Sequence, residues 1–418
     1  GRLDEAIVDY QEALRARPDY MGAHYNIGLL RQAQGRLDDA IARYNEALRI
    51  DPGLDRTWLN RGLARVEQGR LDDALADYDA ALKINPRFAM AHYNRAAVLQ
   101  EQGRTDEALA GYNTALQLDP RLAEAYCNRG QVKRTLGDVD GAFEDFERAL
   151  AADPKLAKGY CNRGATRQSL GRIDDALADY NEALRLDPAL AMALVGRGTI
   201  RKTRGQLDEA VADFNEALRI DPHTHDAYTH RAACRQLLGR IDEAIADYTA
   251  ALQIQPRNAV SLNNRGHAYQ AKGKLDAAIA DFDAALAINA RYTTPLVNRG
   301  MARHAQGRFA DAIADYTSAL AIDPEMVDAY YSRGNARLAA NQLDDALADF
   351  DATLRLNPNL WSAAANRGTV FARLNRMDDA LAAFLQAYPL CKDPAMRGKL
   401  AEAIRQLGGT VPDGPGGD

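Results

Sequence analysis

The apolar positions of the chain follow a pattern that returns every 34 residues. Each period holds two stretches in which apolar side chains are spaced three and four residues apart, the spacing of one face of an α-helix. In one of the second stretches, for example, Ala176, Tyr180 and Ala183 share such a face. We therefore predict an antiparallel hairpin of two amphipathic helices in every period, packed through a seam of small and aromatic side chains.

A turn residue and a terminal proline mark the period. Proline stands in ten of its eleven places, and Ala290 takes the other. The turn residue is glycine nine times, and the last two hairpins have Asn341 and Asn375, the other residue type that tolerates a left-handed backbone. A half unit, 1–20, comes first. Full units of 34 residues then start at positions 21, 55, 89, 123, 157, 191, 225, 259, 293, 327 and 361.

The first half unit is a second helix without its first helix. Its apolar residues have no hairpin partner, so we expect an exposed apolar face that favours self-association. The sequence also begins at Gly1 and not at methionine, so we expect an upstream segment to have been removed.

The array is expected to end in a separate capping helix. Beyond the repeat region, 21–394, the pair Asp393 and Pro394 suits the cap and the first position of a helix. We predict that this helix, 395–408, covers the apolar face of the last hairpin, as terminal repeats require. Its apolar stripe consists of Met396, Leu400, Ile404 and Leu407. Residues 409–418 are expected to form a disordered tail.

Composition and charge disfavour several kinds of partner. A chain of 418 residues with 26% charged and 47% hydrophobic residues is typical of a folded, soluble protein. A net charge of -6 and a pI near 5.8 disfavour nucleic acid and anionic membranes, which bind clustered positive charge. No apolar run approaches the roughly 20 residues that span a bilayer. We expect a cytoplasmic protein without a membrane partner.

The order of small residue, aromatic residue and proline identifies a known repeat. The second helix carries alanine from Ala6 to Ala380, and four residues later an aromatic residue from Tyr10 to Phe384. With the proline and the 34-residue period, this order resembles the tetratricopeptide repeat over residues 1 to about 392. The resemblance implies an all-α fold, a tetratricopeptide-type α-solenoid in which antiparallel helix hairpins form a right-handed superhelix, with ligands bound on its concave inner wall.

One departure from the family concerns a charged pair. The family usually has leucine before the first-helix glycine, whereas ten units here have arginine and only Ile27 keeps the family pattern. The second helix usually has aspartate before its aromatic residue, and the unit with Ile27 has Arg43 there. We interpret this as a ladder of structural arginine–aspartate pairs. The alternative is a basic strip that binds an acidic ligand.

The candidate binding residues are asparagines that stand just before this arginine. Gly196, His230 and Ser332 interrupt their row. The row consists of Asn26, Asn60, Asn94, Asn128, Asn162, Asn264, Asn298 and Asn366. A carboxamide offers a donor and an acceptor, so it is able to pair with a peptide unit whatever the side chain of that residue. The resemblance places the row on the concave wall, and it is similar to the asparagine ladder in O-linked N-acetylglucosamine transferases. The alternative is that these asparagines bond only to neighbouring helices.

Other chemistry is not indicated by the sequence. There is no catalytic motif, and we expect no enzyme activity, cofactor or metal. We interpret His223, His225 and His230 as solvent-facing residues, because their spacing does not by itself gather three imidazoles around one ion. Cys127 and Cys161 occupy equivalent places in adjacent units and are expected to be small thiols that line the groove.

Three functions compete. The first is a non-catalytic scaffold that binds extended peptide segments of partner proteins in its concave groove. The second is the substrate-recruiting arm of a larger enzyme such as a glycosyltransferase. The third is RNA binding by helical repeats, which the acidic balance disfavours. The carboxylate clamp of chaperone-binding family members is also disfavoured, because no residue that precedes a row position is basic.

Overall fold

The computed structural model describes residues 2–412, which form 24 α-helices and no strand. The chain divides into two compact units, residues 1–200 and 201–418, and each is described by itself. None of the helices within residues 2–412 is long and apolar enough to cross a membrane. The expected all-α architecture is confirmed.

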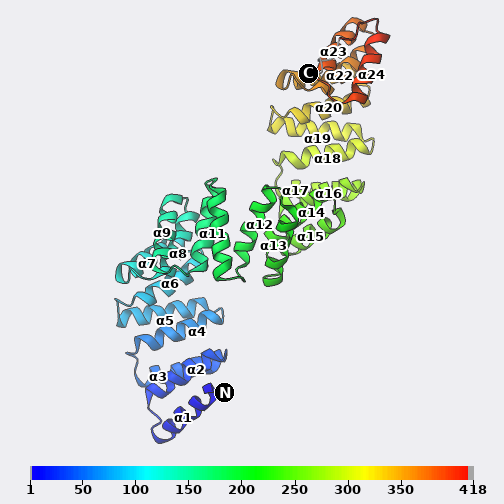
Figure 1. Ribbon diagram of the computed structural model, residues 1–418. Coiled ribbons are helices and arrows are strands. Elements are labelled where there is room, and N and C mark those ends of the chain that lie inside the picture. Colours follow the sequence, from blue (N-terminus) through cyan, green and yellow to red (C-terminus); the bar gives the residue numbers. More distant parts are fainter. Residues whose placement is uncertain (1, 413–418) are drawn as a thin grey trace. The chain divides into compact units, whose positions relative to one another are not determined.

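The N-terminal unit is a stack of helical hairpins in which successive helices lie side by side (Figure 1). Each hairpin begins at the first residue of a 34-residue unit. The helices are α1 (Arg2–Ala16), α2 (Met21–Ala33), α3 (Leu37–Ile50), α4 (Asp55–Glu67), α5 (Leu71–Ile84), α6 (Ala89–Glu101), α7 (Thr105–Leu118), α8 (Ala123–Thr135), α9 (Val139–Ala152), α10 (Ala157–Ser169), α11 (Ile173–Leu186) and most of α12 (Ala191–Thr203).

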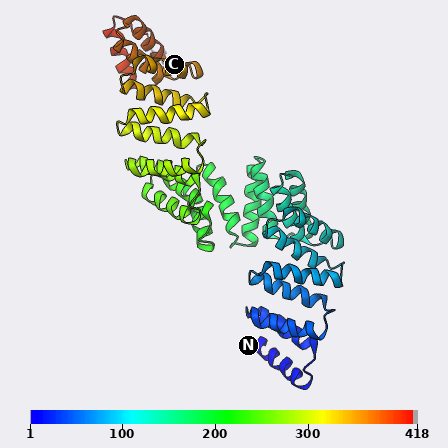
Figure 2. The ribbon, with the colours of Figure 1, turned by 180° about the vertical axis from the view of Figure 1, so that it is seen from behind.

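The C-terminal unit repeats the same arrangement, which is also visible from behind (Figure 2). Its last helix follows the final hairpin. The helices are α13 (Leu207–Ile220), α14 (His225–Leu237), α15 (Ile241–Ile254), α16 (Ala259–Ala271), α17 (Leu275–Ile288), α18 (Thr293–Ala305), α19 (Phe309–Ile322), α20 (Val327–Ala339), α21 (Leu343–Leu356), α22 (Trp361–Arg373), α23 (Met377–Leu390) and α24 (Pro394–Gln406).

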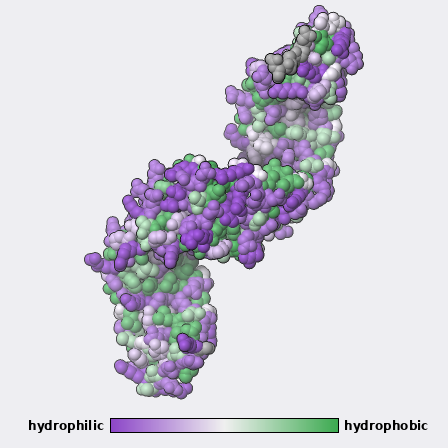
Figure 3. All heavy atoms as spheres, viewed as in Figure 1, coloured by the Kyte–Doolittle hydropathy of each residue, from purple (hydrophilic) through white to green (hydrophobic). Residues whose placement is uncertain are grey.

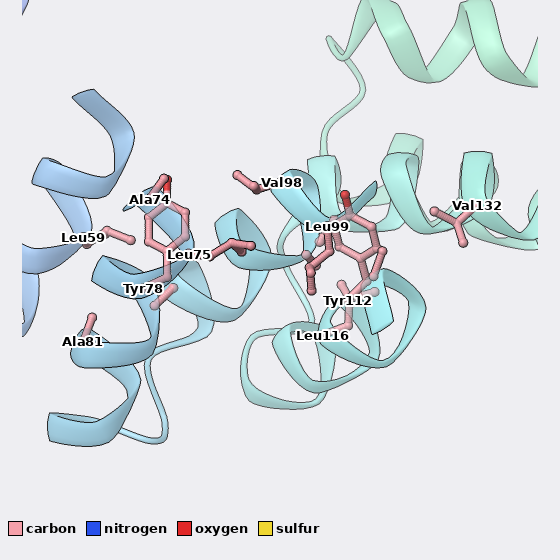
Figure 4. Packing of buried hydrophobic residues seen from close by; sticks show 14 residues of the cluster. Leu59, Ala74, Leu75, Tyr78, Ala81, Val98, Leu99, Tyr112, Leu116 and Val132 are labelled. Atoms are coloured by element: carbon pink, nitrogen blue, oxygen red, sulfur yellow. The ribbon is translucent and has the colours of Figure 1, made fainter. Parts of the chain in front are cut away.

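The aromatic residue of each second helix packs against a small residue of the first helix. A Cβ atom added to Gly62 would lie 2.5 Å from the ring of Tyr78, closer than real Cβ contacts come. Because the glycine lacks that atom, the two helices approach closely and Tyr78 is fully buried. The same seam continues into the next hairpin, where Leu99 and Tyr112 are also fully buried (Figure 4).

The turns have the backbone that the sequence predicts. The nine turn glycines have positive φ angles, as at Gly35 with φ 71°. Asn341 and Asn375, which replace glycine in the last two hairpins, both have φ 60°. These asparagines therefore occupy the left-handed region in place of glycine, as predicted.

The last hairpin is covered by α24. The Asp393 carboxylate caps this helix by accepting hydrogen bonds from the amides of Ala395 and Met396. Leu400 and Ile404 are buried against the last hairpin, and Met396 and Leu407 pack around them. Of the predicted disordered tail, residues 413–418 lie outside the described residues. Residues 409 and 411 do not fit that prediction, because the amide of Gly409 donates to the Ile404 carbonyl at 2.9 Å and Val411 packs on the same apolar cluster.

At the other end, α1 packs on α2. Ile7 is buried in this contact, whereas Leu3 and Val8 are 42% and 51% exposed. An apolar surface is therefore present on the first helix, as expected for a second helix without its partner, and self-association through it stays a prediction.

Candidate functional site

In seven hairpins the arginine of the first helix forms a two-pronged ion pair with the aspartate of the second helix. In the fourth full hairpin, Nε and a terminal nitrogen of Arg129 donate to the Asp145 carboxylate at 2.8 and 2.6 Å. The Asp145 side chain is fully buried. The same pairs are Arg61–Asp77, Arg163–Asp179, Arg231–Asp247, Arg265–Asp281, Arg299–Asp315 and Arg333–Asp349. The structural interpretation of the ladder is confirmed.

The arginine also connects neighbouring hairpins. The second terminal nitrogen of Arg129 donates at 2.8 Å to Asn113 on the preceding second helix. Equivalent bonds run from Arg61 to Asn45 and from Arg231 to Asn215. The guanidinium groups are therefore engaged within the stack, which argues against the alternative of a basic strip open to an acidic ligand.

A second cation, which the sequence analysis missed, contacts the same buried aspartate. It lies four residues after the arginine, as with Lys133, whose ammonium is 2.9 Å from Asp145. The other examples are Arg65, Arg167, Arg201, Arg235, Arg303 and Arg337. A spacing of four places both cations on one helical face, so this signal was present in the sequence.

The asparagine row contacts the first helix of the preceding hairpin, whereas the arginines contact second helices. Asn162 is buried, and the other seven row residues are partly buried. The amide of Asn60 donates to the Tyr25 hydroxyl at 2.9 Å, and that of Asn128 donates to the Tyr93 hydroxyl at 3.3 Å. Equivalent bonds join Asn162 to Cys127, Asn298 to Asn263, and Asn366 to Tyr331. In all five bonds the acceptor lies 35 residues earlier, on the preceding first helix, so these asparagines also hold neighbouring hairpins together.

Two positions show how this contact depends on the neighbour. The residue 35 positions before Asn94 is Leu59, which has no acceptor, and the Asn94 amide nitrogen is buried with no hydrogen-bond partner among residues 2–412. At Gly196, where the row is interrupted, an added Cβ would lie 2.3 Å from the ring of Tyr180. The ring of the preceding hairpin therefore occupies the space that an asparagine at position 196 would need.

Cavities open between successive first helices beside this row. One of about 190 Å³ is lined by Asn128, Asn162, Cys127 and Cys161, among others. Others of about 230 and 160 Å³ lie at two of the three tyrosines that accept from the row, Tyr25 and Tyr93. Polar residues cover most of the face seen in Figure 3, and apolar residues form separate patches on it. Asn128 and Asn162 of the row thus line a space large enough to receive a side chain.

The cysteines and histidines do not form a reactive or metal site in the described part of the chain. Cys127 and Cys161 are free, buried and line the cavity as expected, and burial raises the pKa of Cys161 to about 12. Within residues 2–412 no group of histidine, cysteine and acidic residues has metal-binding geometry. The prediction for His225 was wrong, because this ring is buried and lies 3.1 Å from the Ser261 hydroxyl. Burial also lowers the pKa of His230 to about 4.

A stack of two-helix units whose contacts recur at a spacing of 34 residues defines a helical-repeat solenoid. Sequence comparison places it more narrowly: the chain belongs to the tetratricopeptide repeat proteins. A family model described as TPR repeat matches residues 1–35, 31–69, 62–103, 236–273 and 300–339. Models described as tetratricopeptide repeat match residues 87–155, 157–190, 193–224, 259–292 and 331–393. Repeats of this kind are typical of scaffolds for protein interaction.

Similar solved structures include the following three chains, of which the first has the same fold. A chain of the APC/C hetero-tetramer Cut9–Hcn1 is 14% identical with a TM-score of 0.54, over 97% of this chain and 93% of that one. Yeast Tom70 is 15% identical with a TM-score of 0.41, over 94% and 96%. MamA is 25% identical with a TM-score of 0.35, over 39% and 95%. A search of curated proteins gave no significant match.

Proposed function

We propose that this protein is a non-catalytic scaffold that binds extended peptide segments of partner proteins along its first helices. The observation that carries the proposal is that two asparagines of the row line an open cavity between first helices. Asn128 and Asn162 line one cavity together with an apolar rim residue, Met192, which is 61% exposed. Backbone-pairing amides beside side-chain pockets are what an extended peptide requires.

The spacing of the row suits such a peptide. First helices of neighbouring hairpins pack about 8–10 Å apart, whereas an extended peptide advances roughly 3.3 Å per residue. One asparagine would therefore meet about every third residue of the peptide. The amides of Asn60 and Asn298 each donate one N–H to the preceding first helix, and a second N–H and the oxygen are left for a peptide. The contact with the preceding helix holds the amide in place before the peptide arrives.

The unbroken run from Asn26 to Asn162 is proposed as the main binding stretch, and Asn264 and Asn298 as a weaker one. A net gain of about 0.5–1.5 kcal/mol per hydrogen bond, reduced by the cost of ordering the peptide, points to roughly micromolar affinity and broad sequence tolerance. The same geometry fits the second candidate, a substrate-recruiting arm of a larger enzyme. Such an arm also binds polypeptides through their backbone, with little dependence on their side chains.

The test starts from a randomised peptide library selected on the immobilised protein. Binding of an enriched peptide is then measured by fluorescence anisotropy for the wild type and for Asn60→Ala/Asn128→Ala/Asn162→Ala. We expect binding weaker by on the order of 100-fold, from about 1 kcal/mol for each of the three lost bonds. A library that yields no peptide, or a triple variant that binds like the wild type, contradicts the proposal.

Two controls separate binding from structural support. Tyr93→Phe removes the hydroxyl that holds Asn128 but leaves the asparagine and the ring, so it should leave affinity within about threefold. Asn298→Ala/Asn366→Ala removes two row residues from the C-terminal unit and should have a smaller effect than the triple variant. If Tyr93→Phe weakens binding as much as Asn128→Ala alone, the asparagines serve only to join hairpins.

A further inference from the structure

A cavity of about 380 Å³ opens between α1, α2 and α3. Its walls include Gln11 of α1, Ile27 and Arg31 of α2, and Arg43 of α3. These are the positions that in other hairpins hold the buried ion pair and its bridge to the preceding hairpin. In the second full hairpin, for example, Arg61 fills the space by donating to the Asp77 carboxylate and to Asn45.

The first full hairpin lacks both residues of the arginine–aspartate pair. Ile27 replaces the arginine, and Arg43 replaces the aspartate. Arg31 keeps the place of the second cation, which elsewhere contacts the aspartate, as Arg65 contacts Asp77 at 2.7 Å. In the first full hairpin, the guanidinium of Arg43 therefore takes the position that the Asp77 carboxylate has in the second hairpin. Arg31 provides another guanidinium beside it.

The two other hairpins without the aspartate have also lost the second cation. In the third hairpin, Gly111 replaces the aspartate and Leu99 replaces the cation. In the eleventh, Ala383 and Phe371 make the same paired change. The first is the one hairpin of eleven whose three positions hold two cations and no acid. Because buried or half-buried charge needs a partner, this arrangement calls for an anion.

Acidic side chains at the cavity do not supply that anion. Asp39 and Glu46 line it, but Asp39 pairs with Arg36 at 2.5 Å and Glu46 pairs with Arg49 at 2.9 Å. Arg31 donates to the neutral side chain of Gln34. Within residues 2–412, Arg43 lines the cavity and forms neither an ion pair nor a hydrogen bond.

From this geometry we propose that the cavity binds an oxyanion, a phosphate or a carboxylate group, in the place of the missing aspartate. Arg31 and Arg43 donate charge-assisted hydrogen bonds to it, and planar guanidinium groups suit the paired oxygens of such groups. The bound group would join α2 to α3 as the aspartate does in the following hairpin. The site is separate from the asparagine row.

The experiment measures amide hydrogen exchange in α2 and α3 of the full chain, with inorganic phosphate and with acetate. Chloride at the same ionic strength is the reference, since screening alone also changes charged surfaces. A ligand that binds only the folded hairpin slows the amide exchange that requires the hairpin to open. At a free ligand concentration of ten times Kd, this exchange should be about elevenfold slower. Slowing by phosphate alone assigns a phosphate group, and slowing by both assigns carboxylates as well. Exchange equal to that in chloride overturns the proposal.

Three variants locate the effect. Arg43→Asp should remove the anion dependence, because the new carboxylate pairs with Arg31. Ile27→Arg/Arg43→Asp rebuilds the pair of the other hairpins and should slow exchange without any anion. Arg15→Asp makes the same change of charge on the exposed surface of α1 and should leave the anion effect intact. If Arg15→Asp abolishes the effect, or Arg43→Asp keeps it, the cavity is not the site.

Discussion

A buried tyrosine–glutamine contact provides a direct test of how each hairpin is held together. The Tyr112 hydroxyl on α7 donates to Gln100 on α6 at 2.7 Å, and Tyr44 and Tyr180 make the same bond. In the eighth hairpin the aromatic residue is Phe282, and the oxygen of the facing Gln270 is buried without a partner among residues 2–412. We predict that Phe282→Tyr stabilises its hairpin and that Tyr112→Phe destabilises its own.

The magnitude follows from the state of the glutamine oxygen. A hydrogen bond contributes about 0.5–1.5 kcal/mol, and a buried acceptor left without a donor costs about 1–3 kcal/mol. Tyr112→Phe creates such an acceptor at Gln100, so we expect a loss of about 1–2 kcal/mol. Phe282→Tyr satisfies Gln270 and should gain about 1 kcal/mol, because a tyrosine ring already occupies the equivalent buried place at Tyr112.

The assay is native-state hydrogen exchange, because a repeat array opens locally and a single unfolding free energy would average over the hairpins. The amides of Ala115 in α7 and Ala285 in α17 report on the two hairpins. A change of 1.4 kcal/mol corresponds to tenfold in the opening equilibrium, so exchange at Ala115 should become about 5- to 30-fold faster in Tyr112→Phe, and exchange at Ala285 about fivefold slower in Phe282→Tyr.

Tyr78→Phe is the matched control. The Tyr78 hydroxyl is buried without a partner among residues 2–412, since Val66 stands where other hairpins have glutamine. Removing this hydroxyl should therefore be neutral or stabilising by up to about 1 kcal/mol. Equal destabilisation in Tyr78→Phe and Tyr112→Phe would show that ring packing, and not the hydrogen bond, sets the effect, and would refute the reasoning.

Three further outcomes are expected. Asp145→Ala should cost about 3–5 kcal/mol in the opening of its hairpin, measured by native-state hydrogen exchange in α8 and α9, because it leaves Arg129 and Lys133 without their buried partner; a loss below 1 kcal/mol contradicts this. The pKa of His230 is about 4 in the folded chain, and its ordinary value is 6.5. Between pH 6.5 and pH 4 the unfolded chain therefore carries a proton on this imidazole that the folded chain lacks. Stability should therefore fall by about 3 kcal/mol as pH drops through this window, and His230→Gln should flatten the profile. Cys161, whose pKa is raised to about 12, should resist iodoacetamide at pH 8 until the chain is unfolded.

The fold followed from the sequence because its determinants are local and periodic. The seam of Ala176, Tyr180 and Ala183 lies within one helix, and its partner helix precedes it in the same 34-residue unit. The arginine–aspartate pair joins residues 16 positions apart within a hairpin, as Arg129 and Asp145 do. Both kinds of contact recur at fixed spacing, so the pattern alone predicts them.

The contacts of the asparagine row were harder to predict, because their partners vary. The acceptor that lies 35 residues before the asparagine is Tyr25, Tyr93 or Cys127 in three cases, and at Leu59 there is none. A varying partner leaves no periodic signal, so the sequence marks the asparagine but not what it contacts. The gap at Gly196 depends on the position of a ring in the preceding hairpin, which spacing does not specify.

The departures from the repeat are informative because equivalent positions of the hairpins pack in equivalent surroundings, so a changed residue can be compared directly with its counterparts. In the third hairpin, Gly111 replaces the aspartate and Leu99 replaces the second cation, so two of the charges are absent. The remaining arginine, Arg95, donates a hydrogen bond to Asp79 of the preceding hairpin at 2.7 Å. No such compensation accompanies Arg43, which adds a cation where a carboxylate is expected. Because an uncompensated charge next to a cavity is costly unless something binds there, this single hairpin differs in kind from the others and is the place where a small anion would act on the array.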